Sequence, residues 1–373
     1  MARGSRSVWA RSHTGSHPRS HHRPRTRLER TTAFLGRHKV VTTFVVVLAL
    51  LAGGVFGWAF YLNAELGAIS RFPITHDGAE PSRVPGQAMN ILLVGADDPD
   101  DNPAKGPNIR QELADGTWTP GAFRSDTTMV LHLDPDHHSG QLISIPRDSW
   151  VPIPGHGRSK LNAAFSWGGP SLLRSTVENL TGLYIDHVMV IDFSGFARLS
   201  EIVGGVDVYV PQTTVDTARD ITWKKGMHHL EGENALFYVR QRYGLPNGDF
   251  DRIQRQQNFL RAMLDKIASK AVLTNPVRVT QLASRLSDTI AVDDQLTTGR
   301  LRSLVLSMVG FRPEDLRFLT APTGGTGRIG SQDVVFLDKP KLHSLFDAVA
   351  HSDFEGWYAH HSIGLLPGGH DIN

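Results

Sequence analysis

The sequence of 373 residues contains no cysteine. This absence excludes disulfides, thiolate nucleophiles and cysteine-bound zinc, but it leaves the compartment open because exported proteins can also lack thiols. We find no internal repeat. A hydrophobic content of 40% and 21 prolines are typical of a globular protein rather than a disordered one. The length fits one large domain or two ordinary ones.

Charged residues are absent between Val40 and Ala64, a stretch that reads VVTTFVVVLALLAGGVFGWAFYLNA. About 23 helical residues span roughly 34 Å, enough to cross a hydrocarbon core of about 30 Å. A cleaved signal peptide has a shorter apolar core with a cleavage site close behind it. Here the apolar segment is long, and Trp58 and Tyr61 lie near its far end, where an aromatic belt is expected. We therefore expect one transmembrane helix over residues 40–63.

The two ends of the chain differ in charge. Residues 1–39 contain ten Lys and Arg and one acid, Glu29, which leaves a net charge of −7 for the rest of a chain whose total is +2. By the positive-inside rule the N-terminus is cytoplasmic and the domain beyond the span is extracytoplasmic. The basic segment has few aromatic residues and no helical period, so we expect a disordered tail rather than a nucleic-acid-binding or metal-binding one.

Segments of strand type and helix type alternate from Met89 onward. This alternation favours one α/β domain over residues 89–352, with helices on both faces of a sheet, a linker at 64–88 and a loose tail at 353–373. Gly182 is expected to end a helix, and Asp293 or Asp294 to cap a later one. Strands are expected over residues 90–98, 128–134, 140–148, 187–193 and 206–210, and helices over residues 170–180, 194–203, 251–270 and 295–309. The helix over 251–270 is expected to be amphipathic, with an apolar stripe formed by Ile253, Leu260, Met263, Leu264 and Ile267.

Aspartates lie where two of the predicted strands meet their loops. Asp97 and Asp98 follow the first strand, and Asp126 precedes the second. Strand ends are where α/β sheets present ligand groups. Carboxylates brought together there repel one another unless a cation joins them, and oxygen ligands of this kind suit Mg²⁺. The other interpretation, that these are ordinary solvated turn residues, stays open on this pattern alone.

Basic residues stand out because the domain is acidic overall. Arg147 ends the third predicted strand, and Arg240 and Arg242 are two apart in FYVRQR. In an extended segment this spacing puts both side chains on the same side. Arg252 and Gln256 are four apart on the following helix and share a face. Guanidinium groups at such positions can bind phosphate in a bidentate manner and keep their charge at any physiological pH.

Further polar residues extend this pattern. Lys160 and Asn162, in SKLNAAF, are expected to add to the same surface, whereas Arg255 and Arg261 project elsewhere from the helix that carries Arg252.

Six motifs in order carry a resemblance to a known family: VGADD, FRSDT, SIPRD, KLNAAFSWGG, LEGENALFYVRQR and GDFDRIQRQQ. They resemble the successive signatures of the LytR–CpsA–Psr (LCP) family over roughly Met89 to Pro322. The resemblance implies a three-layer α/β/α sandwich with a central mixed sheet outside the membrane. It also implies an enzyme that transfers a glycopolymer from a polyprenyl-diphosphate carrier to peptidoglycan, leaving a phosphodiester link.

The resemblance also assigns roles to residues. Asp97 and Asp126 match the family's Mg²⁺ ligands, so Mg²⁺ is the expected cofactor. The residues expected to contact the diphosphate are Arg124, Arg147, Lys160, Arg240, Arg242, Arg252 and Gln256. Those expected to act in catalysis are Arg147, Arg240, Arg242 and Asp249. The chain departs from the family pattern at Pro99, where many members have Arg, and in a long polar segment from Asp98 to Arg124.

The sequence leaves several alternatives open. Asp148, Asp249 or another residue is the general base, and the polymer is of teichoic acid, arabinogalactan or capsule type. Water in place of a sugar hydroxyl would make the chain a lipid-diphosphate hydrolase. A non-enzymatic membrane-bound sensor or scaffold for lipid diphosphates is the other rival interpretation.

The charge division generates a topology prediction. Protease added to intact spheroplasts should digest the domain after Glu65 and spare the basic tail, because positive residues are retained in the cytoplasm. Immunoblotting with antibodies to each end distinguishes the two parts. Protection of the domain would contradict the predicted orientation.

Overall fold

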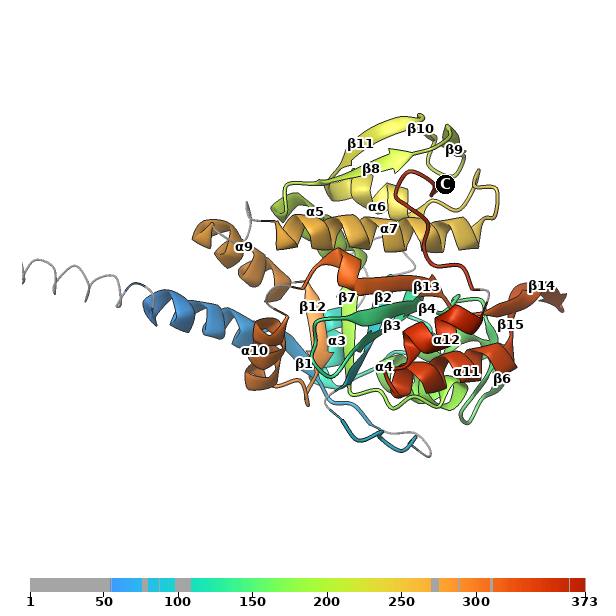
Figure 1. Ribbon diagram of the computed structural model, residues 1–373, viewed down its shortest axis with the longest axis horizontal. Helices are drawn as coiled ribbons and strands as arrows, with labels where there is room; N and C mark the ends of the chain where they lie inside the picture. Colours follow the sequence, from blue (N-terminus) through green and yellow to red (C-terminus); the bar gives the residue numbers. More distant parts are fainter. Residues whose placement is uncertain are drawn as a thin grey trace, which may run out of the picture. The chain divides into compact units, whose positions relative to one another are not determined.

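The computed structural model describes residue 54 and residues 56–75, 80–86, 88–97, 109–269, 275–287, 289–308, 311–361 and 363–372. The chain divides into two compact units, Met1–Ala59 and Phe60–Asn373. The fold described below is that of the second unit (Figure 1).

Most of the predicted span at residues 40–63 lies outside the described residues. Within the part of the chain that the structure describes, no helix combines the length and the apolarity needed to cross a bilayer. In the second unit, residues 60–68 are helical.

A mixed sheet of seven strands forms the centre of the unit, in the order β1-β12-β7-β2-β3-β4-β13. Pairing is parallel for β1 with β12, β7 with β2, and β4 with β13, and antiparallel elsewhere. The strands are β1 (Ser70–Phe72), β2 (Met89–Asp97), β3 (Arg124–Leu133), β4 (Gly140–Ser144), β7 (His187–Asp192), β12 (Ile290–Asp293) and β13 (Leu316–Thr320).

Helices cover both faces of this sheet, as Figure 1 shows. One face carries α5 (Phe193–Ile202), α6 (Gly232–Arg240) and α7 (Asp249–Ala268), and the other carries α4 (Leu161–Thr181), α11 (Lys339–Ala350) and α12 (Phe354–His360). Other helical elements of the described residues are the helix at residues 60–68, α3 (Ile109–Asp115), α9 (Pro276–Ser287), α10 (Thr298–Ser307) and the 3₁₀ turn η1 (Pro313–Asp315). The predicted three-layer arrangement around a mixed sheet is therefore present.

The alternation of apolar side chains along the strands produces the two core layers. In β3, Val130 joins the core beneath α4 and α11, whereas its neighbour Met129 joins the opposite one, against Leu260 and Leu264 of α7. Successive side chains of a strand point to opposite faces, so one strand contributes to both layers. The apolar stripe predicted for α7 is confirmed by these contacts.

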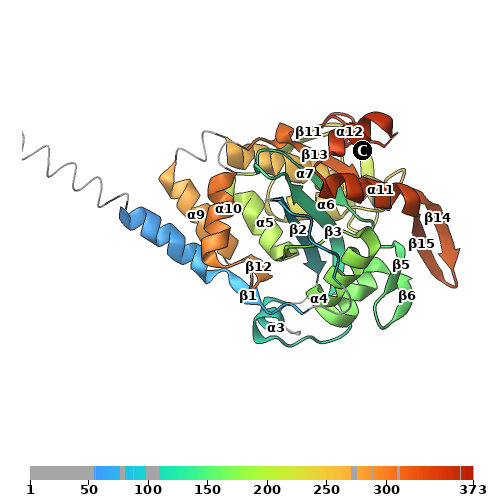
Figure 2. The same cartoon turned by 60° about the horizontal axis from the view of Figure 1, so that its bottom comes forward.

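Four short two-stranded sheets surround the main one. Figure 2 shows the β5–β6 and β14–β15 hairpins side by side at one end of the unit. The segment predicted as a strand at 206–210 is β8, and it pairs with β11 rather than with the main sheet. The hairpin strands are β5 (Trp150–Ile153), β6 (Gly157–Lys160), β8 (Val206–Val210), β9 (Thr214–Asp216), β10 (Ile221–Trp223), β11 (Gly226–Leu230), β14 (Thr323–Ile329) and β15 (Gln332–Leu337).

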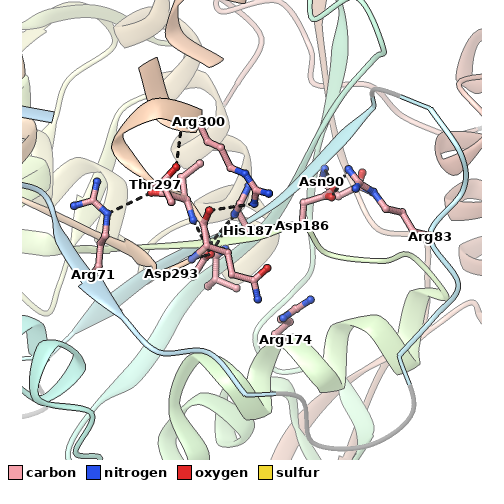
Figure 3. Close-up of polar contacts among 12 residues, drawn as sticks. Arg71, Arg83, Asn90, Arg174, Asp186, His187, Asp293, Thr297 and Arg300 are labelled. Carbon is pink, nitrogen blue, oxygen red and sulfur yellow. Dashed lines mark hydrogen bonds and ion pairs between the residues drawn. The ribbon is translucent and has the colours of Figure 1, made fainter. Parts of the chain in front are cut away.

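Helix ends follow the expected chemistry with two corrections. Gly182 ends α4 with a left-handed φ of 72°, as predicted, although α4 starts earlier than expected and kinks at Gly168 and Gly169. The predicted aspartate cap of α10 is wrong, because Thr297 caps it by accepting from the Arg300 amide. Asp293 instead accepts from the amides of Val188, Gln295 and Leu296 and so joins β7 to the turn before α10 (Figure 3).

Two segments expected to lie outside the fold belong to it. The predicted linker contains β1, which forms an edge of the sheet by pairing with β12. The predicted tail contains α12, where Phe354 and Trp357 are buried in the main core. Neither segment has a long apolar period, so the burial of a few large side chains was not visible in the sequence.

Truncating Trp357 tests whether this last segment stabilises the domain. Its ring is buried and its indole N–H donates to Ser344 Oγ at 2.9 Å. Trp357→Ala should lower the free energy of unfolding by about 3 kcal/mol or more, the usual cost of such a truncation in a core. Urea denaturation measures the change, and His360→Ala on the exposed side of the same helix is the control. Equal midpoints for the two variants would contradict the assigned packing.

Candidate functional site

An irregularity between two central strands shapes the start of the site. Gly95 pairs with Thr127 and Ala96 pairs with Ser125, so Asp126 is the extra residue of a β-bulge. Bulges re-aim side chains and are frequent beside active sites. Asp97 ends β2 opposite Arg124, but its side chain and the whole of residues 98–108 lie outside the described part.

Gly95 permits the close pairing at this bulge. A Cβ at this position would lie 3.0 Å from the Cβ of Thr127. That is tighter than most contacts of a Cβ atom, so a side chain here would require Thr127 to shift by a few tenths of an ångström. The local geometry around Asp126 therefore depends on the glycine that pairs with its neighbour Thr127.

The loop after β4 carries the next charged residues. The strand ends at Ser144, earlier than predicted, because Pro146 has no amide to extend the ladder. Backbone bonds hold the loop from two directions: the amides of Leu161 and Asn162 donate to the carbonyls of Ser149 and Arg147, and the amide of Val335 donates to that of Asp148. The loop is therefore fixed between the start of α4 and β15.

Arg147 forms an ion pair with Asp126, which unites the loop with the bulge. Its Nε also lies 3.8 Å from Asp148 Oδ2, and Lys160 Nζ lies 2.9 Å from the other oxygen of Asp148. Burial alone would lower the pKa of Arg147, but the nearby carboxylates of Asp126, Asp249 and Asp148 outweigh it and raise that pKa. Arg147 is therefore a permanent cation among three anions.

The first turn of α7 supplies the other half of the cluster. Arg252 Nη2 lies 2.6 Å from Asp249 Oδ1. Burial lowers the pKa of Arg252, and the nearby cations Arg147 and Arg242 lower it further. The carboxylates of Asp249 and Asp126 oppose this shift without cancelling it. These mutual influences show that the described site residues from β3, the loop after β4, the α6–α7 connection and α7 lie close together.

Several polar atoms in this cluster are buried without a hydrogen-bond partner among the described residues: Arg147 Nε, Arg252 Nε and both carboxylate oxygens of Asp249. Asp249 and Arg252 attract one another at short range, yet no donor is aligned with the carboxylate. Buried polar atoms are nearly always paired in native proteins, and the exceptions concentrate at functional sites. The two arginine N–H donors can bind an anionic group, and the Asp249 carboxylate beside them can accept from a hydroxyl or bind a cation.

The geometry expected for the arginine pair is wrong. The structure places Arg240 at the last position of α6, Gln241 is extended, and Arg242 lies outside regular secondary structure. The two side chains are therefore not related by the alternation of a strand. Tyr238 and Val239 explain the helix, because both are buried in the core between α6 and α7. The Arg242 guanidinium donates to the Tyr243 hydroxyl at 2.8 Å and lies 4.9 Å from that ring's centre.

The remaining predicted residues lie around this cluster. Arg124 is exposed at the start of β3, and Arg240 is half-buried at the end of α6. Gln256 donates to the Val239 carbonyl at 3.3 Å and so contacts the last turn of α6. Their roles stay predictions.

The buried Arg255 was not predicted to contribute to the site, but it positions the segment that carries Arg242. Arg255 donates to Gln241 Oε1 at 2.5 Å and to Thr214 Oγ1 at 3.1 Å, and its guanidinium stacks on Tyr238. Gln241 in turn donates to the Tyr243 carbonyl at 2.9 Å. Both side chains are fully buried. Arg255 does project away from the charged cluster, as predicted, but no sequence signal marked its contact with the neighbouring segment.

A comparison of the chain with known protein families agrees with the family that the order of the motifs predicts. Residues 74–351 match the LytR_cpsA_psr family, which is well over half of the chain. The chain belongs to the LytR_cpsA_psr family. The predicted family is therefore confirmed.

Two curated relatives illustrate the similarity. The probable cell wall biosynthesis protein LcpB of Corynebacterium glutamicum is 36% identical over 275 residues, covering 72% of this chain and 62% of LcpB. TagV of Bacillus subtilis, a polyisoprenyl-teichoic acid–peptidoglycan teichoic acid transferase, is 34% identical over 223 residues, covering 58% of this chain and 56% of TagV. The chain thus spans less than two thirds of the length of both relatives.

Solved structures of family members share the fold. The crystal structure of B. subtilis TagV gives a TM-score of 0.58 at 28% identity, covering 73% of this chain and 99% of that one. TagT bound to LIIa-WTA gives a TM-score of 0.57 at 23% identity, covering 76% and 100%. The predicted α/β fold with a central mixed sheet is confirmed by these likenesses.

Replacing Arg255 tests its positioning role. For the lipid-diphosphate transfer that the motifs lead us to expect, Arg255→Gln should reduce donor turnover by about tenfold to a hundredfold, since a misplacement of about 1 Å in a site can cost that much. Arg261→Gln is the matched control, because Arg261 is on the same helix and donates instead to the Pro367 carbonyl.

A double-mutant cycle separates positioning from general destabilisation. If Arg255 acts through Arg242, the effects of Arg255→Gln and Arg242→Lys on turnover should be clearly non-additive. Full additivity of the two effects, with equal melting temperatures for Arg255→Gln and Arg261→Gln, would contradict the positioning role.

Proposed function

We propose that the chain is a membrane-anchored transferase that moves a cell-wall glycopolymer from a polyprenyl-diphosphate carrier to a sugar hydroxyl of peptidoglycan. The observation that carries the proposal is the group of buried polar atoms on Arg147, Arg252 and Asp249 that have no hydrogen-bond partner among the described residues. Relatives named as teichoic acid transferases, and the structure of TagT bound to LIIa-WTA, support the substrate class. Residues 40–63 are proposed as the anchor, with the N-terminus in the cytoplasm.

The arginines are proposed to bind the diphosphate. Phosphoryl transfer depends mostly on positioning and on neutralising the charge of the transferred group and the leaving group. The Nε atoms of Arg147 and Arg252 are buried donors, and Arg242 is near enough to Arg252 to influence its pKa. An anionic diphosphate in this region would satisfy these donors and reduce the repulsion between the guanidinium groups.

The acidic residues fit a divalent cation. Mg²⁺ prefers carboxylate oxygens and binds proteins through one or two of them while sharing substrate phosphates. Asp126 at the bulge and Asp97 at the adjacent strand end would hold the ion. Among the described residues, no group of three or more acidic or histidine side chains is arranged to bind a metal ion without the substrate. A bound Mg²⁺ would neutralise negative charge on the diphosphate oxygens.

The reaction requires a base for the acceptor. The oxygen of the sugar hydroxyl forms a bond to the phosphorus of the polymer-linked phosphate, and the bond from that phosphorus to polyprenyl phosphate breaks. The hydroxyl proton goes to a carboxylate, and we assign it to Asp249. Both candidate carboxylates form an ion pair, Asp148 with Lys160 at 2.9 Å and Asp249 with Arg252 at 2.6 Å, but only the two oxygens of Asp249 are buried without an aligned hydrogen-bond donor. Product analysis without peptidoglycan tests water as the alternative acceptor.

A metal titration tests the site. Turnover of a lipid-diphosphate donor by the wild type should saturate with Mg²⁺ and be lost in chelator. Asp97→Ala and Asp126→Ala should each reduce turnover by about 10² to 10³ and require far more metal. Asp207→Ala, which removes an exposed carboxylate on β8, is the control.

The metal dependence separates two effects of losing Asp126, because this change also removes the ion-pair partner of Arg147. A loss of turnover with an unchanged Mg²⁺ requirement would mean that Asp126 only positions Arg147. A wild type indifferent to chelator would refute the metal assignment as a whole.

A further inference from the structure

The helix at residues 60–68 contacts both α9 and α10, and Figure 2 shows these two helices beside it. Ser287 of α9 donates to Glu65 Oε2 at 3.5 Å. Arg302 of α10 donates to Asn63 Oδ1 at 3.3 Å. Leu66 packs among the apolar residues of this region. The helix is therefore part of the folded unit rather than a loose connection.

Arg71 fixes the end of this helix to the sheet. Its Nη1 donates to the carbonyls of Gly67 and Ile69, both at 3.0 Å, and its Nη2 to Thr298 Oγ1 at 3.0 Å. Figure 3 shows Arg71 beside the start of α10, where Thr297 and Arg300 also lie. One guanidinium thus joins the helix, β1 and α10, so these elements keep one orientation.

Large apolar side chains are exposed around the helix. Phe60 is 77% exposed, Val277 of α9 is 62% exposed, and Val305 and Leu306 of α10 are 52% and 63% exposed. Scattered exposed apolar residues are normal, but a group of them on adjacent elements marks an interaction site.

The same helices are basic within an acidic domain. Together α9 and α10 contain Arg278, Arg285, Arg300 and Arg302, all exposed, and neither helix contains an acidic residue. On α10, Arg302, Val305 and Leu306 lie on one face because they are three and four residues apart. Helices with arginine beside exposed apolar residues bind anionic lipid surfaces.

We infer that Phe60, Val277, Arg278, Arg302, Val305 and Leu306 form a membrane-contact surface that lies on an anionic lipid bilayer. The inference rests on the proposed anchor, because residue 60 lies near the outer end of the apolar stretch. A second copy of the chain is a poorer occupant, since a two-fold contact would bring like charges together without acidic partners in either helix. Contact at this surface, together with the Arg71 clamp, would hold the domain in one orientation on the membrane.

Single-cysteine labelling tests this contact in the full chain, which contains no cysteine of its own. Leu306→Cys carries an environment-sensitive fluorophore, and Met227→Cys on β11, 59% exposed, is the matched control. The protein is reconstituted in phosphatidylcholine vesicles with and without phosphatidylglycerol, some containing doxyl-labelled lipid. We expect a blue shift and lipid quenching at Leu306→Cys and neither at Met227→Cys. The shift should shrink without phosphatidylglycerol and at high salt.

Charge reversal gives a second measure. Arg278→Glu should weaken the quenching at Leu306→Cys, whereas Arg328→Glu on the β14–β15 hairpin should leave it unchanged. Aqueous emission at Leu306→Cys in vesicle-bound protein would overturn the inference, and so would self-quenching between labels without lipid quenching, which would indicate a second copy. Failure of the chain to float with vesicles would refute both the anchor and this surface. Donor turnover is measured in a separate assay. Absence of turnover with lipid quenching present would contradict only the proposed transferase activity, and turnover without lipid quenching would contradict only the membrane-contact surface.

Discussion

Alternation of charge around Arg147 is the constraint on which the candidate site depends. Arg147, Arg242 and Arg252 are close enough for their charges to interact, and burial further disfavours the cation of Arg252. Asp126, Asp148 and Asp249 offset this repulsion. Removing one partner of a buried ion pair commonly costs about 3 to 5 kcal/mol because the remaining charge stays buried. The bulge, the loop after β4 and the first turn of α7 must therefore keep their relative positions.

Helix α7 maintains much of that arrangement. On one side, Gln257 donates to Ser144 Oγ at 2.8 Å and to the Leu319 carbonyl at 2.7 Å, which attaches the helix to β4 and β13. On another, Arg255 attaches it to Gln241 beside Arg242. The helix thus connects Asp126 of the sheet and Arg147 of the loop after β4 with the segment that supplies Arg242. A rigid element is well suited to this task because catalytic sites tolerate little misplacement.

Much of the fold and site was predictable from local pattern. The apolar runs predicted β2, β3 and β7, the stripe on residues 251–270 predicted α7, and the order of the motifs predicted the family. The errors have a common cause, which is tertiary packing. Tyr238 and Val239 look like part of a strand, but they are buried between two helices. Strand β1 and helix α12 belong to the fold because their large apolar side chains are buried in the main core. The bulge at Asp126 arises because Gly95 pairs with Thr127 and Ala96 with Ser125, a register that sequence position does not reveal.

Arginine content alone does not distinguish the two basic regions of this protein, but their surroundings do. In the site, Arg147 and Arg252 are largely buried and form ion pairs with Asp126 and Asp249, which hold the two guanidinium groups in place. A ligand must therefore either displace these carboxylates or add to the ion pairs already present. On α9 and α10, arginines are exposed beside apolar side chains, with no acid in either helix. The first environment favours a compact, multiply charged group held in one geometry. The second favours a broad anionic surface with an apolar layer beneath it, because exposed charges act over a Debye length of about 8 Å rather than through directed bonds. Burial and the arrangement of counter-charges, rather than net charge, therefore assign a different partner to each region.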